Sequence, residues 1–173
     1  VTGGRVLVRN LSLDSAQGDV KFVHVLEKMG CDVSATEEGI VVQGPEILSG
    51  IDIDMNGMPD AAQTLAAIAP FSDSPVTIRN VPNMRIKETD RIDAMAAELT
   101  KLGVKVDVWA DGLRIHPTEV FVPAALDTYD DHRMAMSLSL IGLRADGVVI
   151  NDPDCVNKTF PAFFETLAKI RPE

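Results

Sequence analysis

The sequence predicts an α/β fold built from a repeated unit of strands and helices. Three strand-like segments resemble one another, RVLVRNL at 5–11, PVTIRNV at 75–81 and GVVINDP at 147–153, at offsets of 70 and 72 residues. An amphipathic helix pattern follows each of them, and two other helix patterns are apolar on all sides, which is typical of buried helices. Recurrence at a fixed spacing indicates a repeated supersecondary unit.

The amphipathic helices are predicted over 19–30, 90–103 and 160–170. In the first two, apolar residues recur at i, i+3 or i+4 and i+7. Gly30 and Gly103 come just after these two helices, where a glycine commonly ends a helix. The apolar positions are Phe22, Val25, Leu26 and Met29 in the first helix and Ile92, Met95, Leu99 and Leu102 in the second.

A predicted hairpin follows each of these two helices, with Gly39 and Gly112 at its turn. The apolar helices come next, over 59–71 and 130–143. The unit is therefore strand, helix, strand, strand, helix, with one strand more or less. We expect a single domain over 1–173 with repeats at about 1–74, 75–146 and 147–173. The last repeat is incomplete, which suggests that part of the domain lies outside this sequence.

The composition excludes several classes of function. A net charge of −10 disfavours nucleic acid and anionic membranes as partners, although a few cations could still bind a small anion. No apolar run reaches the ~18 residues of a membrane span, and no signal peptide pattern is present. Cys31 and Cys155 are expected to be free thiols in the cytoplasm. His24, His116 and His132 form no metal-binding pattern, so we expect no metal.

Unusual polar residues gather at helix starts and loops that equivalent repeats would place at one end of the domain. They lie in MPDAAQT, NMRIKETDR, DDHRMAM and NKTFP. Helix N-termini favour anions, and lysine or arginine beside them would bind phosphate or carboxylate. By itself, Asp60 also fits an ordinary first-turn acid after proline, and Lys158 fits an ordinary surface lysine.

The two charged helix starts have two interpretations. Thr89 or Asp90 could simply cap the helix at 90–103, and either aspartate of DDHR could cap the next helix. However, Arg91 and Arg133 lie in first turns, where a cation opposes the helix dipole. An anion opposite these arginines would explain their position.

Several motifs resemble the 5-enolpyruvylshikimate-3-phosphate (EPSP) synthase family of carboxyvinyl transferases. RIKETDRIDAMAAELTKLG (85–103) and YDDHRMAM (129–136) carry the resemblance, and MPDAAQT, SAQGD, LEKMG and NKTFPAFFETL follow the order of the family's C-terminal half. The resemblance covers essentially the whole chain. Two alternatives remain: the related UDP-N-acetylglucosamine enolpyruvyl transferases, which lack this combination of motifs, and a non-catalytic anion-binding or interaction module.

The resemblance implies a two-domain enzyme. Each domain of this family contains three β-α-β-α-β-β units, with buried helices and outward-facing sheets, as an inside-out α/β barrel. The chain resembles one such domain without the short N-terminal segment that completes it. The partners implied are that segment and the second domain, which contributes a Lys-Ser-rich loop and a Gly-rich loop to the site. The isolated chain is therefore expected to be inactive and to bind the inhibitor glyphosate weakly or not at all.

The family reaction transfers the enolpyruvyl group of phosphoenolpyruvate to the 5-hydroxyl of shikimate 3-phosphate and releases phosphate, without a metal or organic cofactor. The resemblance implies that Asp60 accepts the hydroxyl proton and that Glu88 handles the C3 proton. Six further side chains are implied in substrate binding. They are Arg91 and Arg133 at the phosphoenolpyruvate carboxylate, Lys158 at its phosphate, Asn83 and Lys87 on the shikimate side, and His132 as a neighbour.

Overall fold

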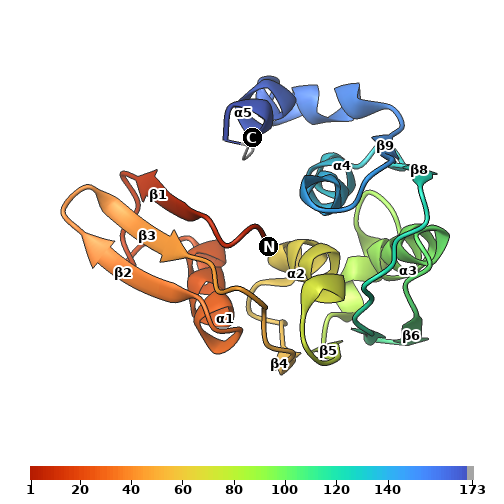
Figure 1. Ribbon diagram of the computed structural model, residues 1–173, viewed down its shortest axis with the longest axis horizontal. Helices are drawn as coiled ribbons and strands as arrows, with labels where there is room; N and C mark the ends of the chain where they lie inside the picture. Colours follow the sequence, from red (N-terminus) through yellow and green to blue (C-terminus); the bar gives the residue numbers. More distant parts are fainter. Residues whose placement is uncertain (171–173) are drawn as a thin grey trace.

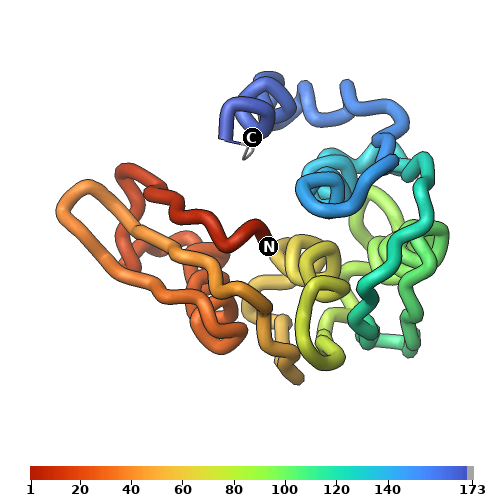
Figure 2. The backbone as a smooth tube through the Cα atoms, viewed as in Figure 1, coloured from red at the N-terminus to blue at the C-terminus, as the bar shows by residue number. Residues whose placement is uncertain are grey.

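The first part of the chain forms a three-stranded antiparallel sheet. Residues 1–170 are described by a computed structural model of the chain (Figure 1, Figure 2). β1 (Arg5–Arg9) pairs with β3 (Gly39–Gln43), which also pairs with β2 (Asp32–Thr36). A 3-10 turn, η1 (Gly18–Lys21), leads into α1 (Phe22–Lys28), which contacts β2. The predicted strand, helix and hairpin of this part are confirmed.

The middle part contains one complete β-α-β-α-β-β unit. Its strands form one sheet in the order β4-β5-β7-β6, in which β4 and β5 are parallel and the other neighbours are antiparallel. This is the order of elements that the family resemblance implied. The elements are β4 (Asp52–Asp54), η2 (Pro59–Ala61), α2 (Ala62–Ile68), η3 (Ala69–Phe71), β5 (Val76–Arg79), η4 (Pro82–Ile86), α3 (Arg91–Lys101), β6 (Val106–Trp109) and β7 (Gly112–Ile115).

The last part adds two parallel strands and two helices. β8 (Ala124–Leu126) pairs with β9 (Val148–Ile150), and α4 (His132–Ser139) connects them through the short turn η5 (Ile141–Leu143). The 3-10 segment η6 (Pro153–Lys158) and α5 (Phe163–Ile170) follow. α4 lies against η6, which brings the DDHRMAM and NKTFP motifs together.

The sheets differ in phase from the repeats seen in the sequence. β1-α1-β2-β3 corresponds to β5-α3-β6-β7, and β8-α4-β9-α5 corresponds to β4-α2-β5-α3. A sheet unit therefore begins one strand and one helix earlier than a sequence repeat. β4 and β8 are the strands for which the pattern gave no signal. Each has only three residues, too few to show alternation, and neither lies in one of the three similar segments, one of which marked the equally short β9.

The helices α2, α3 and α4 lie together in the interior of the fold, with strands beside them (Figure 1). α2 packs against both α3 and α4. Leu65 of α2, Met95 and Leu99 of α3 and Leu138 of α4 are fully buried. The predicted buried helices are confirmed, as is the arrangement with helices inside. In residues 1–170 the three sheets remain separate, so the expected closed barrel is not formed by these residues.

The two hairpin glycines are required by a close approach of strands. Gly39 has a φ of 152°, and an added Cβ would collide with the carbonyl oxygen of Val8 in β1. Gly112 occupies the equivalent place in the second sheet, where a Cβ would collide with the carbonyl oxygen of Ile78 in β5. The repeat therefore extends to the steric environment of individual residues.

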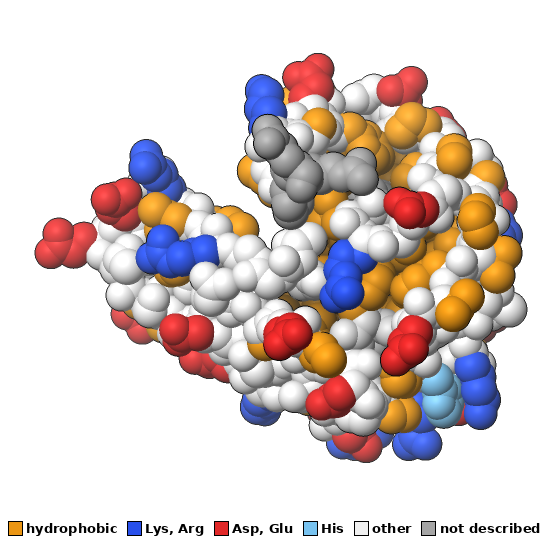
Figure 3. Space-filling model, viewed as in Figure 1, with side chains coloured by type: hydrophobic (Ala, Val, Ile, Leu, Met, Phe, Trp, Pro, Cys, Tyr) orange, Lys and Arg blue, Asp and Glu red, His pale blue; other side chains and the backbone are white. Residues whose placement is uncertain are grey.

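Part of the surface is apolar. Figure 3 shows apolar side chains over the centre and right of one face, and a hollow between the β1–β3 sheet and the part that carries α5. Val6 and Val8 of β1 are 49% and 46% exposed, and none of the described residues of α5 is buried. Within residues 1–170, no helix has the length and apolar character to cross a bilayer. Cys31 and Cys155 are both free thiols, as expected.

Candidate active site

Arg91 is the centre of the predicted site. The Asp90 side chain accepts a hydrogen bond from the backbone N–H of Asp93 at 3.2 Å, so Asp90 caps α3 and Arg91 begins it. The Arg91 residue is only 1% exposed. Its Nε and Nη2 donate to the two carboxylate oxygens of Asp131 at 2.7 and 3.2 Å. This bidentate geometry is the strongest form of an arginine–carboxylate pair.

Two further carboxylates complete the surroundings of Arg91. Its Nη1 donates to Asp60 Oδ1 at 3.1 Å, and its Nη2 donates to Glu88 Oε2 at 2.8 Å. Four of the five N–H donors of a guanidinium are therefore used by protein carboxylates. The negative charge expected opposite this arginine is therefore present, and it is supplied by carboxylates of the protein itself.

Asp131 belongs to the cluster, although the sequence assigned it no specific role beyond that of a possible cap. It is fully buried and accepts a hydrogen bond from the backbone N–H of Arg133 at 2.9 Å, so it is the N-cap of α4. A buried carboxylate is tolerated only when it is paired and hydrogen-bonded, and Arg91 provides that pairing. The sequence held no signal to separate this role from capping, because the partner lies 40 residues away.

Asp60 connects the two remaining cations of the cluster. It lies in η2, where its Oδ1 lies 3.4 Å from Lys87 Nζ and its Oδ2 lies 3.2 Å from Arg133 Nη2. Partial burial raises the pKa of Asp60, but the charges of Arg133, Lys87 and Arg91 and the hydrogen bond from Lys87 outweigh it and hold the pKa below its ordinary value. An ionised Asp60 can accept a hydrogen bond or a proton at neutral pH.

His132 and Lys158 lie at the edge of this cluster. His132 Nδ1 is 4.0 Å from Asp131 Oδ1 and, among residues 1–170, has no hydrogen-bond partner. Burial lowers the pKa of His132, and Lys158 and Arg133 lower it further, against the opposite effects of Asp131 and Glu88. Lys158 Nζ lies 3.5 Å from the backbone oxygen of Asp130.

Asn83, like Lys158, forms no hydrogen bond or ion pair with the side chains of the cluster within residues 1–170. It lies in η4, which packs beside η2. Its Oδ1 is buried and unpaired within the described part of the chain. A buried acceptor without a partner is costly, so Asn83 is suited to a polar ligand group or an ordered water.

Arg85 fixes the loop that carries these residues, a role the sequence did not reveal. Its Nε and Nη2 donate to the backbone oxygens of Ala110 and Trp109 at 2.7 and 2.8 Å. Its Nη1 donates to Asp90 and Asp93 at 2.7 and 3.0 Å. The β6–β7 hairpin and the start of α3 are thus tied to the KETDR segment.

The cluster is electrically balanced and partly exposed. Side chains of Asp60, Glu88, Lys87 and Arg133 are 31–39% exposed, so they remain accessible to a ligand from solvent. Three carboxylates and three cations neutralise each other. Strong binding of an anion is therefore favoured if the anion displaces a carboxylate from a cation, or if another part of the enzyme supplies further positive charge. No group of three potential ligands in residues 1–170 could hold a metal ion.

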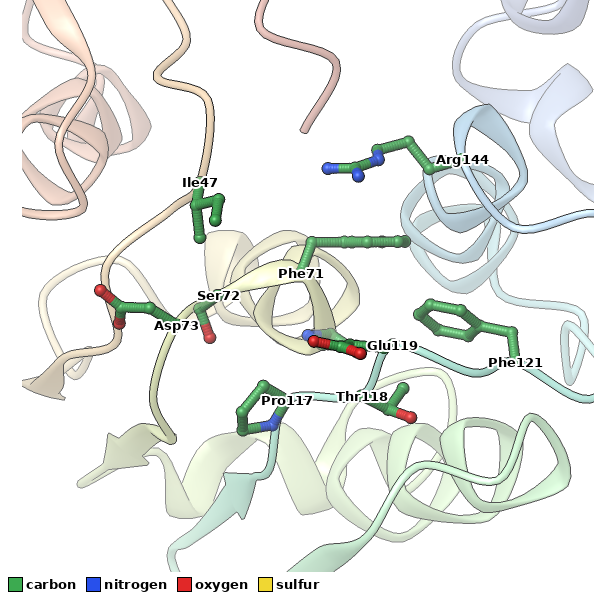
Figure 4. Close-up of a pocket in the computed structure, with 10 residues that line it drawn as sticks. Ile47, Phe71, Ser72, Asp73, Pro117, Thr118, Glu119, Phe121 and Arg144 are labelled. Carbon is green, nitrogen blue, oxygen red and sulfur yellow. The ribbon is translucent and has the colours of Figure 1, made fainter.

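A pocket of about 550 Å³ lies away from the cluster and contains none of the predicted residues (Figure 4). Phe71 and Phe121 pack with ring centroids 5.0 Å apart. The Arg144 guanidinium lies over the Phe71 ring at 5.5 Å and donates to the backbone oxygen of Val1 at 3.1 Å. None of the residues of the charged cluster lines this pocket.

Comparisons with known proteins identify the family. Residues 1–167 match the EPSP synthase (3-phosphoshikimate 1-carboxyvinyltransferase) family. A 3-phosphoshikimate 1-carboxyvinyltransferase of Trichormus variabilis is 54% identical over 170 residues, which are 98% of this chain and 40% of that protein. The chloroplastic protein of Arabidopsis thaliana is 48% identical over 177 residues, covering 98% of this chain and 34% of that protein.

Comparison with solved structures indicates the same family. An EPSP synthase structure from Acinetobacter baumannii superposes with a TM-score of 0.84 and 26% identity, covering 96% of this chain and 42% of that one. The chain spans about 40% of the length of the first curated relatives it matches. On this evidence, the chain belongs to the EPSP synthase family.

Proposed function

We propose that the chain provides one side of the active site of a 3-phosphoshikimate 1-carboxyvinyltransferase. The observation that carries the proposal is the convergence of Asp60, Glu88 and Arg133 on the buried Arg91–Asp131 pair. The reaction joins phosphoenolpyruvate to the 5-hydroxyl of shikimate 3-phosphate and releases phosphate. It needs a base, an acid and cations, and the cluster contains all three kinds of group.

Asp60 acts as the base in this proposal. Its ionised carboxylate takes the proton of the 5-hydroxyl as the oxygen attacks C2 of phosphoenolpyruvate. In the loaded site Glu88 is protonated and delivers its proton to C3. The resulting Glu88 carboxylate takes a proton back from the new methyl group as the C–O bond to phosphate breaks, and Asp60 gives the hydroxyl proton to the departing phosphate. Arg91 contacts both carboxylates, which holds the two groups at a fixed separation. Positioning of this kind is a major source of catalysis.

The two arginines have unequal roles. Arg133 is 34% exposed and is the principal ligand of the phosphoenolpyruvate carboxylate. Arg91 has one N–H donor left beyond its four bonds to carboxylates, so its main role is to hold Asp60, Glu88 and Asp131. Lys158 binds the phosphate, His132 lies beside it, and shikimate 3-phosphate contacts are made by Asn83 and Lys87.

The proposal requires a further part of the enzyme. The charge balance of the cluster leaves little net attraction for the highly charged substrates, so additional cations must come from outside residues 1–170. In these residues, β1 pairs only with β3 and β9 only with β8, whereas β5 has a neighbour on each side. The free edges can accept strands of that further part. We expect no measurable turnover by the 173-residue chain alone.

Substitution of the two carboxylates tests the proposal. In a complete synthase that carries this domain, Asp60→Ala and Glu88→Ala are each expected to reduce kcat about 10²–10⁴-fold, the usual contribution of a general acid or base. Near-normal turnover in both variants would refute these roles. An assay with UDP-N-acetylglucosamine as acceptor separates the related transferase reaction. Mixing the chain with the remaining part should restore activity, whereas a non-catalytic interaction module would bind without turnover.

A further inference from the structure

Residues 127–131 form the segment that leads into α4, and two of them have an unusual backbone conformation. Tyr129 and Asp130, the two residues before the Asp131 cap, both have left-handed conformations, with φ of 56° and 54°. Non-glycine residues rarely adopt this conformation, and a pair of them persists only when the surroundings hold them in place. The start of α4 is therefore positioned by contacts outside the segment.

Glu98 of α3 supplies the central contact. Its side chain has no exposed surface. Glu98 Oε1 accepts from the Tyr129 hydroxyl at 2.7 Å, and Oε2 accepts from the backbone N–H of Asp127 at 2.9 Å. Lys101 Nζ lies 2.8 Å from Oε2 and compensates the buried charge. Tyr129 is 42% exposed, and its partial burial together with its bond to Glu98 raises the pKa of the phenol to about 12, so it remains a donor at all ordinary pH values.

The neighbouring residues are held in the same way. Asp127 accepts from Lys101 Nζ and from Asn151 Nδ2, both at 2.7 Å. The backbone N–H of Asp131 donates to the carbonyl oxygen of Thr128 at 2.9 Å. These bonds tie the segment to α3 on one side and to the end of β9 on the other.

Glu98 and Arg91 lie seven residues apart on α3, a spacing that places both on one face of the helix. Arg91 holds Asp131, and Glu98 holds Asp127 and Tyr129. We propose that Glu98 and Tyr129 are positioning residues that fix the start of α4, and with it Arg133, relative to Glu88 on the KETDR segment.

The chemistry of the contact favours positioning over simple stabilisation. A buried carboxylate is costly, and an apolar side chain of similar size often stabilises a core at least as well. A fully satisfied polar network instead selects one arrangement of the segments that it joins. The catalytic consequence rests on the proposed function, because it concerns where Arg133 meets phosphoenolpyruvate.

Tyr129→Phe tests this inference with little change in shape. In a complete synthase that carries this domain, the variant should lower kcat/KM for phosphoenolpyruvate about tenfold, as expected for one charge-assisted hydrogen bond. The KM for shikimate 3-phosphate should change less than about twofold, because its proposed ligands lie outside the segment. Glu98→Leu should lower kcat/KM for phosphoenolpyruvate further, again with little change in the KM for shikimate 3-phosphate.

Thr100→Val is the matched control. It removes a hydroxyl hydrogen bond from the same helix, the 2.7 Å bond to the Ala96 carbonyl, without touching the segment. It should leave both kinetic constants unchanged. Two results would indicate a general stability effect and overturn the inference. One is a KM for shikimate 3-phosphate that rises in Tyr129→Phe by as much as kcat/KM for phosphoenolpyruvate falls. The other is a fall in kcat/KM for phosphoenolpyruvate in Thr100→Val that matches the fall in Tyr129→Phe.

Hydrogen exchange provides a readout that does not depend on the reaction. The Asp127 and Asp131 amides should exchange about tenfold faster in Tyr129→Phe, and not in Thr100→Val. Unchanged exchange together with unchanged kcat/KM for phosphoenolpyruvate would refute the inference. If the wild-type synthase fails to transfer the carboxyvinyl group, the proposed function fails, and the exchange experiment alone decides whether Tyr129 positions the segment. If Glu98→Leu does not fold, Tyr129→Phe decides both points.

Discussion

The buried Arg91–Asp131 pair gives the sharpest stability prediction. Asp131→Asn keeps a side chain that can cap α4 but removes the charge that faces Arg91. Removing one partner of a buried ion pair costs about 3–5 kcal/mol, because the other charge is left uncompensated. Arg91 retains Asp60 and Glu88 at 3.1 and 2.8 Å. We therefore expect the lower end of that range, about 3 kcal/mol.

Asp130→Asn is the matched control for this experiment. Asp130 is adjacent, exposed and in a left-handed conformation with φ of 54°, which asparagine tolerates well. Its substitution should change the free energy of unfolding by less than about 0.5 kcal/mol. Urea unfolding of both variants at pH 7 measures the difference from the transition midpoints at constant slope.

Salt separates a buried pair from a surface pair. Exposed ion pairs weaken as ionic strength rises, whereas buried pairs are screened much less. The difference between Asp131→Asn and Asp130→Asn should therefore persist at high salt. Equal stability of the two variants, or a difference that disappears in high salt, would refute the view that Asp131 is the buried counter-ion of Arg91.

Three other outcomes follow from the same cluster. Because the pKa of Asp60 is lowered in the folded chain, its ionised form stabilises the fold fully above the unfolded pKa of about 3.9, and this stabilisation is lost as pH falls through the lower folded pKa. In urea unfolding, the difference in stability between wild type and Asp60→Asn should therefore shrink in acid. A difference that stays constant with pH would contradict this. His132 should titrate below pH 6.5 by NMR, with the signal assigned by His132→Gln, because burial opposes its charged form; a midpoint above 6.5 would contradict it. Calorimetry should detect no tight binding of glyphosate to the 173-residue chain, because the cluster is already neutral, and micromolar affinity would refute that reasoning.

The helices were predictable because their patterns are long enough to be periodic. Ile92, Met95, Leu99 and Leu102 follow the helical period, and all four are fully buried, the first three in α3 and Leu102 at its C-cap. β4 was not predictable, because a three-residue strand becomes a strand only through its pairing with β5. The phase of the repeat was hidden for the same reason, since this pairing crosses from one sequence repeat into the next.

Position in the site was predictable, but the partners of each charge were not. The repeat and the motifs placed Asp60, Arg91 and Arg133 at one end of the domain, where the structure brings them together. Glu98 gave no signal, because a glutamate in an amphipathic helix normally faces solvent, yet it is fully buried here. Its role depends on Tyr129, which is 31 residues away in the sequence.

Arg91 is a cation in the first turn of α3, where the helix dipole disfavours it. A cation at a helix N-terminus does require an anion nearby, and that deduction was correct for Arg91. The identity of the anion was open, since a substrate carboxylate and a protein carboxylate satisfy the same requirement. Asp131 satisfies it within the chain. Arg133, in the first turn of α4, is a third exposed, and within residues 1–170 its side chain pairs with a single carboxylate, Asp60. Of these two arginines it is therefore the one better placed to exchange that contact for a substrate anion.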